Sequence, residues 1–257
     1  MFPAGVEHGR LTPSEDLADF VEHYWWVRWD VPSPSVSEVL SYPSVHVVCE
    51  ADEARVMGVV RGRFTRRVEG AGAVFGIKFH PGMFRAFSAE PAFRLTNRTR
   101  PLADELGEGG GSLARRLRAA SSAVERATLA EGALRDARPQ RPANALLARD
   151  IVIRVRHDGS LQSVASVAGV AGLSERALQR LFRDYVGVSP KWVVRRFRLQ
   201  EAAERLATGD DTVAAVAAML GYFDQAHFVR DFKSVVGRTP IEYVREAQRS
   251  SGKDSTP

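Results

Sequence analysis

The sequence predicts an α+β protein of two parts, a β-rich N-terminal part followed by a wholly helical C-terminal part. Three observations support this prediction. Short runs rich in Val, Tyr, Trp and Phe, separated by Pro, Ser or Gly, fill residues 23–79, as half-buried strands do. Helical patterns dominate from residue 83 onward, and the proline-containing stretch 138–142 interrupts them once. The length of 257 residues suits about two domains.

The strand-like runs predict a small antiparallel β barrel or sandwich with trailing helices. Turns are expected at residues 32–35 and 70–72, which are rich in Pro and Ser or in Gly. The predicted strands cover residues 23–31, 36–42, 45–51, 55–68 and 73–79, and the predicted helices cover 83–89, 102–106, 112–120 and 124–137. We place the domain boundary in the proline-containing stretch, which predicts a first domain over 1–138, a second over 144–249 and a disordered polar tail over 250–257.

The composition is that of an ordinary globular protein. No apolar run reaches 18 residues and the N-terminus lacks the pattern of a signal peptide, so we expect no membrane partner and a cytoplasmic location. The single cysteine, Cys49, lies in an apolar stretch and is expected to be a buried structural thiol. Most of the net charge of +5 lies in residues 144–249, with 16 Lys and Arg against 12 Asp and Glu, a balance compatible with phosphate binding.

A repeat inside the C-terminal part is the most informative feature. Residues 164–190 align with 213–240, first at an offset of 49 and, after one extra residue in the turn, at an offset of 50. Each copy has a short Ala- and Val-rich helix, a turn glycine at Gly172 or Gly221, and an amphipathic second helix. Ser174 and Asp224 are placed to cap the second helices. This is the pattern of a helix-turn-helix, present twice.

The second helix of each copy has an apolar face and a polar face. Residues such as Leu178, Phe182, Phe228 and Phe232 are expected in the core. Between the copies, residues 191–208 contain no Gly or Pro and predict a rod of roughly 27 Å, comparable with the ~34 Å between successive major grooves on one face of B-DNA. One monomer is therefore expected to read two adjacent groove segments. The predicted DNA-binding residues are Arg176, Gln179, Arg180 and Arg183, then Gln225, His227, Arg230 and Lys233.

These residues resemble those of the AraC/XylS family of bacterial transcription regulators, whose DNA-binding domain joins two helix-turn-helices by a long helix. The resemblance covers about residues 144–247. Its carriers are Gly172-Leu173-Ser174 with Leu178-Gln179-Arg180-Leu181-Phe182, Gly221-Tyr222-Phe223-Asp224-Gln225-Ala226-His227-Phe228 with Phe232-Lys233, and Gly237-Arg238-Thr239-Pro240 with Tyr243. It implies a DNA-binding regulator of transcription and not an enzyme, with double-stranded DNA as partner and RNA polymerase as a further candidate partner.

The N-terminal part is similar to the domain that precedes this DNA-binding module in many such regulators. The similarity is carried by His23-Tyr24-Trp25-Trp26 and by Gly76-Ile77-Lys78-Phe79-His80-Pro81-Gly82. Such domains often hold a pocket for a small-molecule effector or the surface of a homodimer, and the motifs do not decide between them. Trp26, Phe79 and His80 are the candidate effector-binding residues, because aromatic walls make a shaped apolar site. Packing in the core of a small barrel explains the aromatic residues equally well.

Two alternatives stay open. The first is a metal-dependent, cupin-like barrel enzyme, in which separate strands gather His23, His46 and His80. The second is a ligand-binding module that carries a DNA-binding tail. The histidines show no paired ligand spacing, and no Gly-rich phosphate loop or nucleophile elbow occurs, so we expect neither a metal nor another cofactor.

Overall fold

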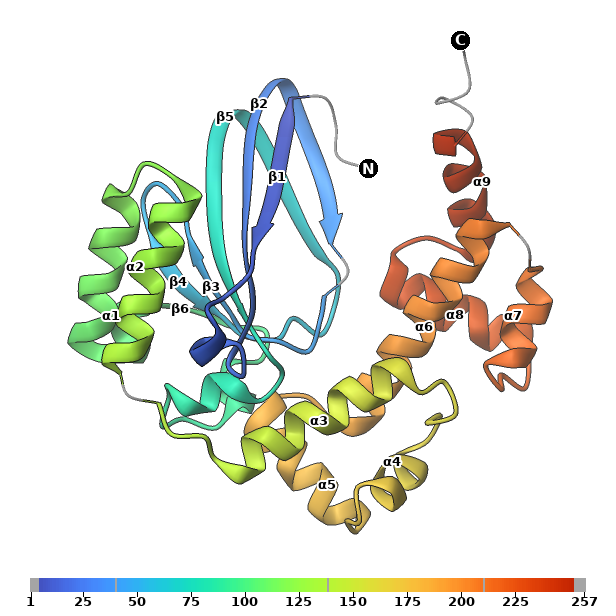
Figure 1. Ribbon diagram of the computed structural model, residues 1–257. Helices are drawn as coiled ribbons and strands as arrows, with labels where there is room; N and C mark the ends of the chain where they lie inside the picture. The colour runs from blue at the N-terminus through green and yellow to red at the C-terminus, as the bar shows by residue number, and fades with distance from the viewer. Residues whose placement is uncertain (1–4, 40, 138, 210, 252–257) are drawn as a thin grey trace. The chain divides into compact units, whose positions relative to one another are not determined.

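A computed structural model describes residues 5–39, 41–137, 139–209 and 211–251 (Figure 1). The chain divides into two compact units. The first unit comprises Met1–Ile153 and Arg176–Ser189, and the second comprises Arg154–Glu175 and Pro190–Pro257. The segment 176–189, which holds the second helix of the first repeat copy, therefore lies in the unit of the β-rich part. The domain boundaries at 138 and 144 stay a prediction about the organisation of the sequence.

The first unit contains an antiparallel sheet, as predicted. Among the described residues this sheet has six strands in the order β1-β2-β5-β3-β4-β6. The strands are β1 (Val6–Leu11), β2 (Val21–Val39), β3 (His46–Cys49), β4 (Ala54–Met57), β5 (Phe64–Phe79) and β6 (Thr99–Pro101). The sequence prediction missed β1 and β6, which form the two edges. Where the structure describes the chain, it shows one sheet without pairing between those edges, so neither barrel closure nor a second sheet of a sandwich is present there.

Both predicted turns are wrong, because the chain continues as strand through each of them. β2 passes through residues 32–35 with a register shift against β5 between Val31 and Ser35. Prolines are tolerated at such an irregularity because they need not donate to the ladder. β5 passes through residues 70–72, and the indole of Trp29 lies so close to Gly72 that a Cβ atom there would collide with it. The absence of a side chain at Gly72 therefore allows the close packing of Trp29 and does not mark a turn.

Two helices, α1 (Leu102–Ala119) and α2 (Ala123–Asp136), pack on each other and cover one face of the sheet (Figure 1). The two helices predicted over 102–106 and 112–120 form α1, with a break at Gly107, where φ is 62°. The helix predicted over 83–89 is only a 3-10 turn, η2 (Met83–Ala86), and further turns are η1 (Glu15–Leu17) and η3 (Ala92–Leu95). The core contains Tyr24, Phe75, Ile77, Leu117, Leu134 and also Cys49, which is 1% exposed, as predicted.

The helix α3 (Ala143–His157) begins in the first unit. Its Ala145 belongs to the core of the sheet, and Arg149 forms an ion pair of 2.9 Å with Asp19. The same unit holds α5 (Glu175–Leu181) from Arg176 onward, and the π-helical turn η4 (Phe182–Val186). Leu178 and Phe182 are wholly buried, as predicted, and Tyr185 packs on the sheet's core.

The second unit is helical, as predicted. It contains α4 (Val164–Val170), α6 (Pro190–Thr208), α7 (Val213–Met219), α8 (Gln225–Val236) and α9 (Pro240–Ser251). Leu199 of α6 packs with Val216, Phe228 and Phe232 in one hydrophobic core. α6 confirms the long helix predicted over 191–208. α9 includes the first two residues of the predicted tail, and residues 252–257 lie outside the described part of the chain. No helix described here has both the length and the apolar character needed to cross a membrane.

Candidate nucleic-acid interface

The turns of the two repeat copies have the same backbone hydrogen bonds. Gly172 and Gly221 have positive φ values of 64° and 69°. The N–H of the residue after each glycine donates to a carbonyl five residues earlier, from Leu173 to Ala168 and from Tyr222 to Ala217, both at 3.0 Å. This pattern is the Schellman motif, which needs a left-handed residue at the position of the glycine. The repeat seen in the sequence is therefore also a repeat of local structure.

The starts and ends of the repeated helices correspond as well. Ser163 caps α4 and Thr212 caps α7, and each hydroxyl accepts a hydrogen bond from the N–H three residues later. Asp224 caps α8, as predicted, by accepting from the N–H of His227 at 2.6 Å, and α5 begins directly after Ser174. Both copies end at a glycine with positive φ, Gly187 or Gly237, and a helix-starting proline follows three residues later.

The polar faces of α5 and α8 are open to solvent. Leu178 and Phe228 point into the cores and are wholly buried, so the opposite side of each helix faces outward. The side chains predicted to contact DNA are all exposed: Arg176, Gln179, Arg180, Arg183, Gln225, His227, Arg230 and Lys233. Their role in binding stays a prediction. Phe223, in the longer turn of the second copy, is 100% exposed, a property that the sequence pattern did not predict.

The end of the first repeat copy is attached to the β-rich part within the first unit. The hydroxyl of Thr96 donates to the carbonyl of Gly187 at 2.6 Å. The guanidinium carbon of Arg183 lies 4.3 Å from the centre of the Phe93 ring, within the range of a cation–π interaction. A Cβ atom on Gly187 would lie 2.9 Å from the carbonyl oxygen of Ala92, so only glycine permits this approach. Arg183 is thus both a predicted DNA contact and a contact of the β-rich part.

In the second copy, the carboxylate of Asp231 is the centre of a polar network. One oxygen pairs with Arg195 of α6 at 2.8 Å, and the other accepts from the hydroxyl of Tyr222 at 3.1 Å. His227 lies 3.7 Å from that second oxygen. Burial, helped by the charge of Asp231, raises the pKa of Tyr222 to about 12, so its hydroxyl stays protonated and donates. The sequence pattern identified His227 but not Arg195 or Asp231.

The candidate effector-binding residues contribute mainly to packing. Phe79 is wholly buried in the core, where its ring meets that of Phe84 edge to face at 5.1 Å. Trp26 packs against the core and covers Gly9, where a Cβ atom would lie 2.7 Å from the indole Nε1. His80 is half-buried, and its desolvation lowers the pKa of the imidazole. Their role in effector binding stays a prediction.

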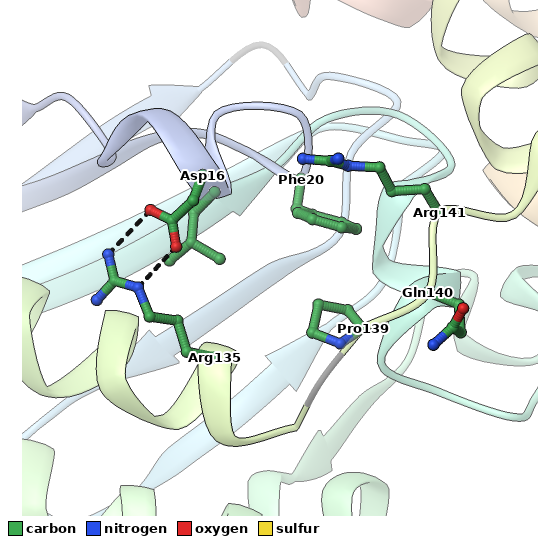
Figure 2. A pocket seen from close by; sticks show the side chains of 7 residues that line it. Asp16, Phe20, Arg135, Pro139, Gln140 and Arg141 are labelled. Carbon is green, nitrogen blue, oxygen red and sulfur yellow. Dashed lines mark hydrogen bonds and ion pairs between the residues drawn. The ribbon is translucent and has the colours of Figure 1, made fainter.

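A shallow pocket of about 480 Å³ in the first unit is lined by other residues (Figure 2). Phe20 and Pro139 contribute apolar surface to it. Arg135 binds both oxygens of Asp16, at 2.7 and 3.0 Å, and Arg141 pairs with Asp19 at 3.1 Å. Both guanidinium groups already have carboxylate partners, so the pocket shows no preference for an anionic ligand. Its lining residues are Asp16, Leu17, Phe20, Arg135, Pro139, Gln140 and Arg141.

The histidines of the sheet do not support the metal-dependent alternative. Within the described ranges, no group of three or more His, Cys, Asp or Glu side chains is arranged to hold a metal ion. Nδ1 of His46 instead accepts a hydrogen bond of 3.2 Å from the indole of Trp25. Burial, followed by the charge of Lys78, lowers the pKa of His23 to about 4 and that of His46 to about 3. Both imidazoles are therefore neutral near pH 7.

Two segments of the chain match known protein families. Residues 167–246 match a helix-turn-helix domain, and residues 9–101 match a domain of unknown function, DUF6597. The C-terminal domain of AraT from Geobacillus stearothermophilus is a similar solved structure, with 25% identity over 39% of this chain and 84% of that chain and a TM-score of 0.36. ToxT from Vibrio cholerae O395 is another, with 12% identity over 93% of this chain and 96% of that chain and a TM-score of 0.39.

The curated relatives are transcription regulators that share part of their length with this chain. The probable transcription factor PqrA of Proteus vulgaris is 36% identical over 80 residues, which are 31% of this chain and 66% of PqrA. A putative AraC-like transcription regulator of Streptomyces lividans is 33% identical over 81 residues, which are 32% of this chain and 27% of that protein. The chain thus spans just under two thirds of the first relative and about a quarter of the second. Over its two helix-turn-helix copies, the chain is thus similar to AraC-like DNA-binding transcription regulators.

Proposed function

We propose that the protein binds a specific double-stranded DNA sequence to control transcription, with α5 and α8 as two recognition helices that read adjacent major-groove segments. The observation that carries this proposal is the duplicated turn geometry, which leaves an exposed polar face on the second helix of each copy. Arg side chains suit the acceptor pair of guanine, and Gln side chains suit the donor and acceptor of adenine. Contacts of Lys and Arg with phosphates would supply most of the affinity, which makes binding strongly dependent on salt.

We further propose that the β-rich part modulates DNA binding, through a small-molecule effector or through self-association. The contacts of Thr96 with Gly187 and of Phe93 with Arg183 support this proposal, since they join η3 and its C-cap to η4, the turn that directly follows α5. A signal that displaces η3 acts on α5 first, because α8 belongs to the other unit. RNA polymerase and a second copy of the chain are partners that follow from the family resemblance alone.

Selection of bound duplexes from a random DNA pool tests the proposed function. The expected result is an enriched sequence with two half-sites about 10 base pairs apart, the spacing of one helical turn. Full-length protein with Arg180→Ala should then lose preference in one half-site, and protein with Arg230→Ala in the other. Absence of any enriched sequence would refute specific reading, and a single contiguous half-site would refute the use of both helices.

A further inference from the structure

A groove of about 620 Å³ lies within the second unit, beside the second reading helix. Its walls come from four places: the start of α4, one side of α6, the turn that leads into α8, and α8 itself. Phe223 and His227 line it, so the groove opens next to the first turn of α8. The lining residues are Gln162, Ser163, Val164, Lys191, Val194, Arg195, Arg198, Gly221, Tyr222, Phe223, His227 and Asp231.

Positive charge dominates this groove. Lys191, Arg195 and Arg198 follow one another at helical spacing, so that one side of α6 presents a basic stripe. The opposing charge is the carboxylate of Asp231, and Arg195 and the Tyr222 hydroxyl already occupy its two oxygens. Arg195 is held further by the hydroxyl of Ser234 at 2.7 Å. Arg195 therefore neutralises Asp231, and the charges of Lys191 and Arg198 remain in excess.

The two remaining cations are available to an incoming anion. The side chain of Lys191 is exposed. The guanidinium of Arg198 rests on the ring of Tyr222, 5.2 Å from its centre, which orients the group without occupying its donors. Within the part of the chain that the structure describes, Nε of Arg198 is buried without a hydrogen-bond acceptor, while the residue as a whole is only half-buried. A phosphate oxygen is a strong acceptor for both kinds of side chain.

The position of the groove favours the DNA backbone as its occupant. When a helix enters the major groove, the phosphates that border the groove lie beside the helix and contact neighbouring parts of the protein. His227 lies on the exposed side of α8 and also lines the groove. DNA read by α8 would therefore bring a phosphate to this side of α6.

We propose that the groove is a third DNA contact, in which Lys191 and Arg198 each contact the phosphate backbone next to the segment read by α8. The site carries no base information and sets the position of the second reading helix on the duplex. This inference rests on the proposed function, because it requires α8 to lie in the major groove. Asp231 acts on the site through Arg195 and Tyr222 as a positioning residue, without touching DNA.

The test measures the affinity of full-length protein for its selected duplex and for an unrelated duplex over a range of salt concentrations. Each neutralised phosphate adds about 0.9 to the slope of log K against log salt. Loss of one contact is therefore expected to weaken binding about fivefold near 0.15 M salt and to lower the slope by about 1. Lys191→Gln and Arg198→Gln should each produce this effect equally on both duplexes. Arg205→Gln is the matched control, since Arg205 lies on α6 outside the groove and pairs with Glu201.

The outcomes separate this inference from the proposed function. An unchanged slope in both groove variants would overturn the phosphate site, and so would weakening confined to the selected duplex, which indicates base reading. A protein that binds DNA without any preferred sequence would overturn the proposed function. The salt slopes measured on the unrelated duplex would still show whether Lys191 and Arg198 contact phosphate. Lys191 is exposed, so Lys191→Gln keeps the test valid if Arg198→Gln disturbs Tyr222 and fails to fold.

Discussion

Replacing Gly187 by alanine tests whether the β-rich part holds the end of the first repeat copy. Gly187 has a φ of 91°, where an alanine costs roughly 1–2 kcal/mol. Its Cβ atom would also lie 2.9 Å from the carbonyl oxygen of Ala92 and 3.0 Å from the hydroxyl oxygen of Thr96. Separation of the two segments would break the hydrogen bond from Thr96, worth about 1 kcal/mol. We therefore expect Gly187→Ala to lower the free energy of unfolding of the first unit by about 2–3 kcal/mol.

Gly70→Ala is the matched control for this prediction. Gly70 lies in the same unit and has a φ of 57°, but a Cβ atom there would meet nothing within 4 Å. The control thus measures the cost of the backbone conformation alone. Urea unfolding followed by tryptophan fluorescence reports on the first unit through Trp25, Trp26 and Trp29 of β2. Equal destabilisation by the two variants would refute the close approach between η3 and the end of the first repeat copy.

Three further predictions concern recognition, capping and pH. Arg230→Ala should weaken binding to the selected duplex by roughly 1–3 kcal/mol and relax base preference locally. Footprinting that shows unchanged affinity and unchanged base preference would contradict the proposed contact of Arg230 with a base. Asp224→Ala should destabilise the second unit by about 1 kcal/mol, whereas Asp224→Asn should retain most of the stability in thermal unfolding. His46 has a pKa of about 3 in the folded chain against 6.5 normally, so the unfolded chain binds the proton more readily. The stability of the first unit should therefore fall as pH decreases below about 6.5, and His46→Gln should flatten this dependence in urea titrations at several pH values.

Much of the helical part was predictable because its determinants are local. A capping side chain acts on an N–H three residues away, as in the bond between Asp224 and His227, and a Schellman turn needs one glycine at one position. Helical periodicity then separates the buried Phe228 from the exposed Arg230. Such signals repeat in the sequence whenever the local structure repeats. The duplication could therefore be recognised from the sequence alone.

The strands were predicted less well because their limits depend on neighbours far away in sequence. The local sequence predicts turns at Pro32 and Gly72, yet each residue lies within a strand. The register shift opposite β5 accommodates the first, and the indole of Trp29 packs over the second. The edge strand β6 has only three residues and β1 has few apolar ones, so neither shows a strand pattern; they are strands because β4 and β2 offer them backbone partners.

The sequence by itself determined the repeated helical units, their caps and the exposed polar faces of the proposed reading helices, because each depends on residues within one or two helical turns. Only the tertiary structure decided which of those side chains meet other elements. Asp231 pairs with Arg195, 36 residues earlier, and Arg183 stacks on Phe93 of the β-rich part. No local pattern encodes these contacts, since packing of distant segments creates them. The groove beside α8 exists for the same reason.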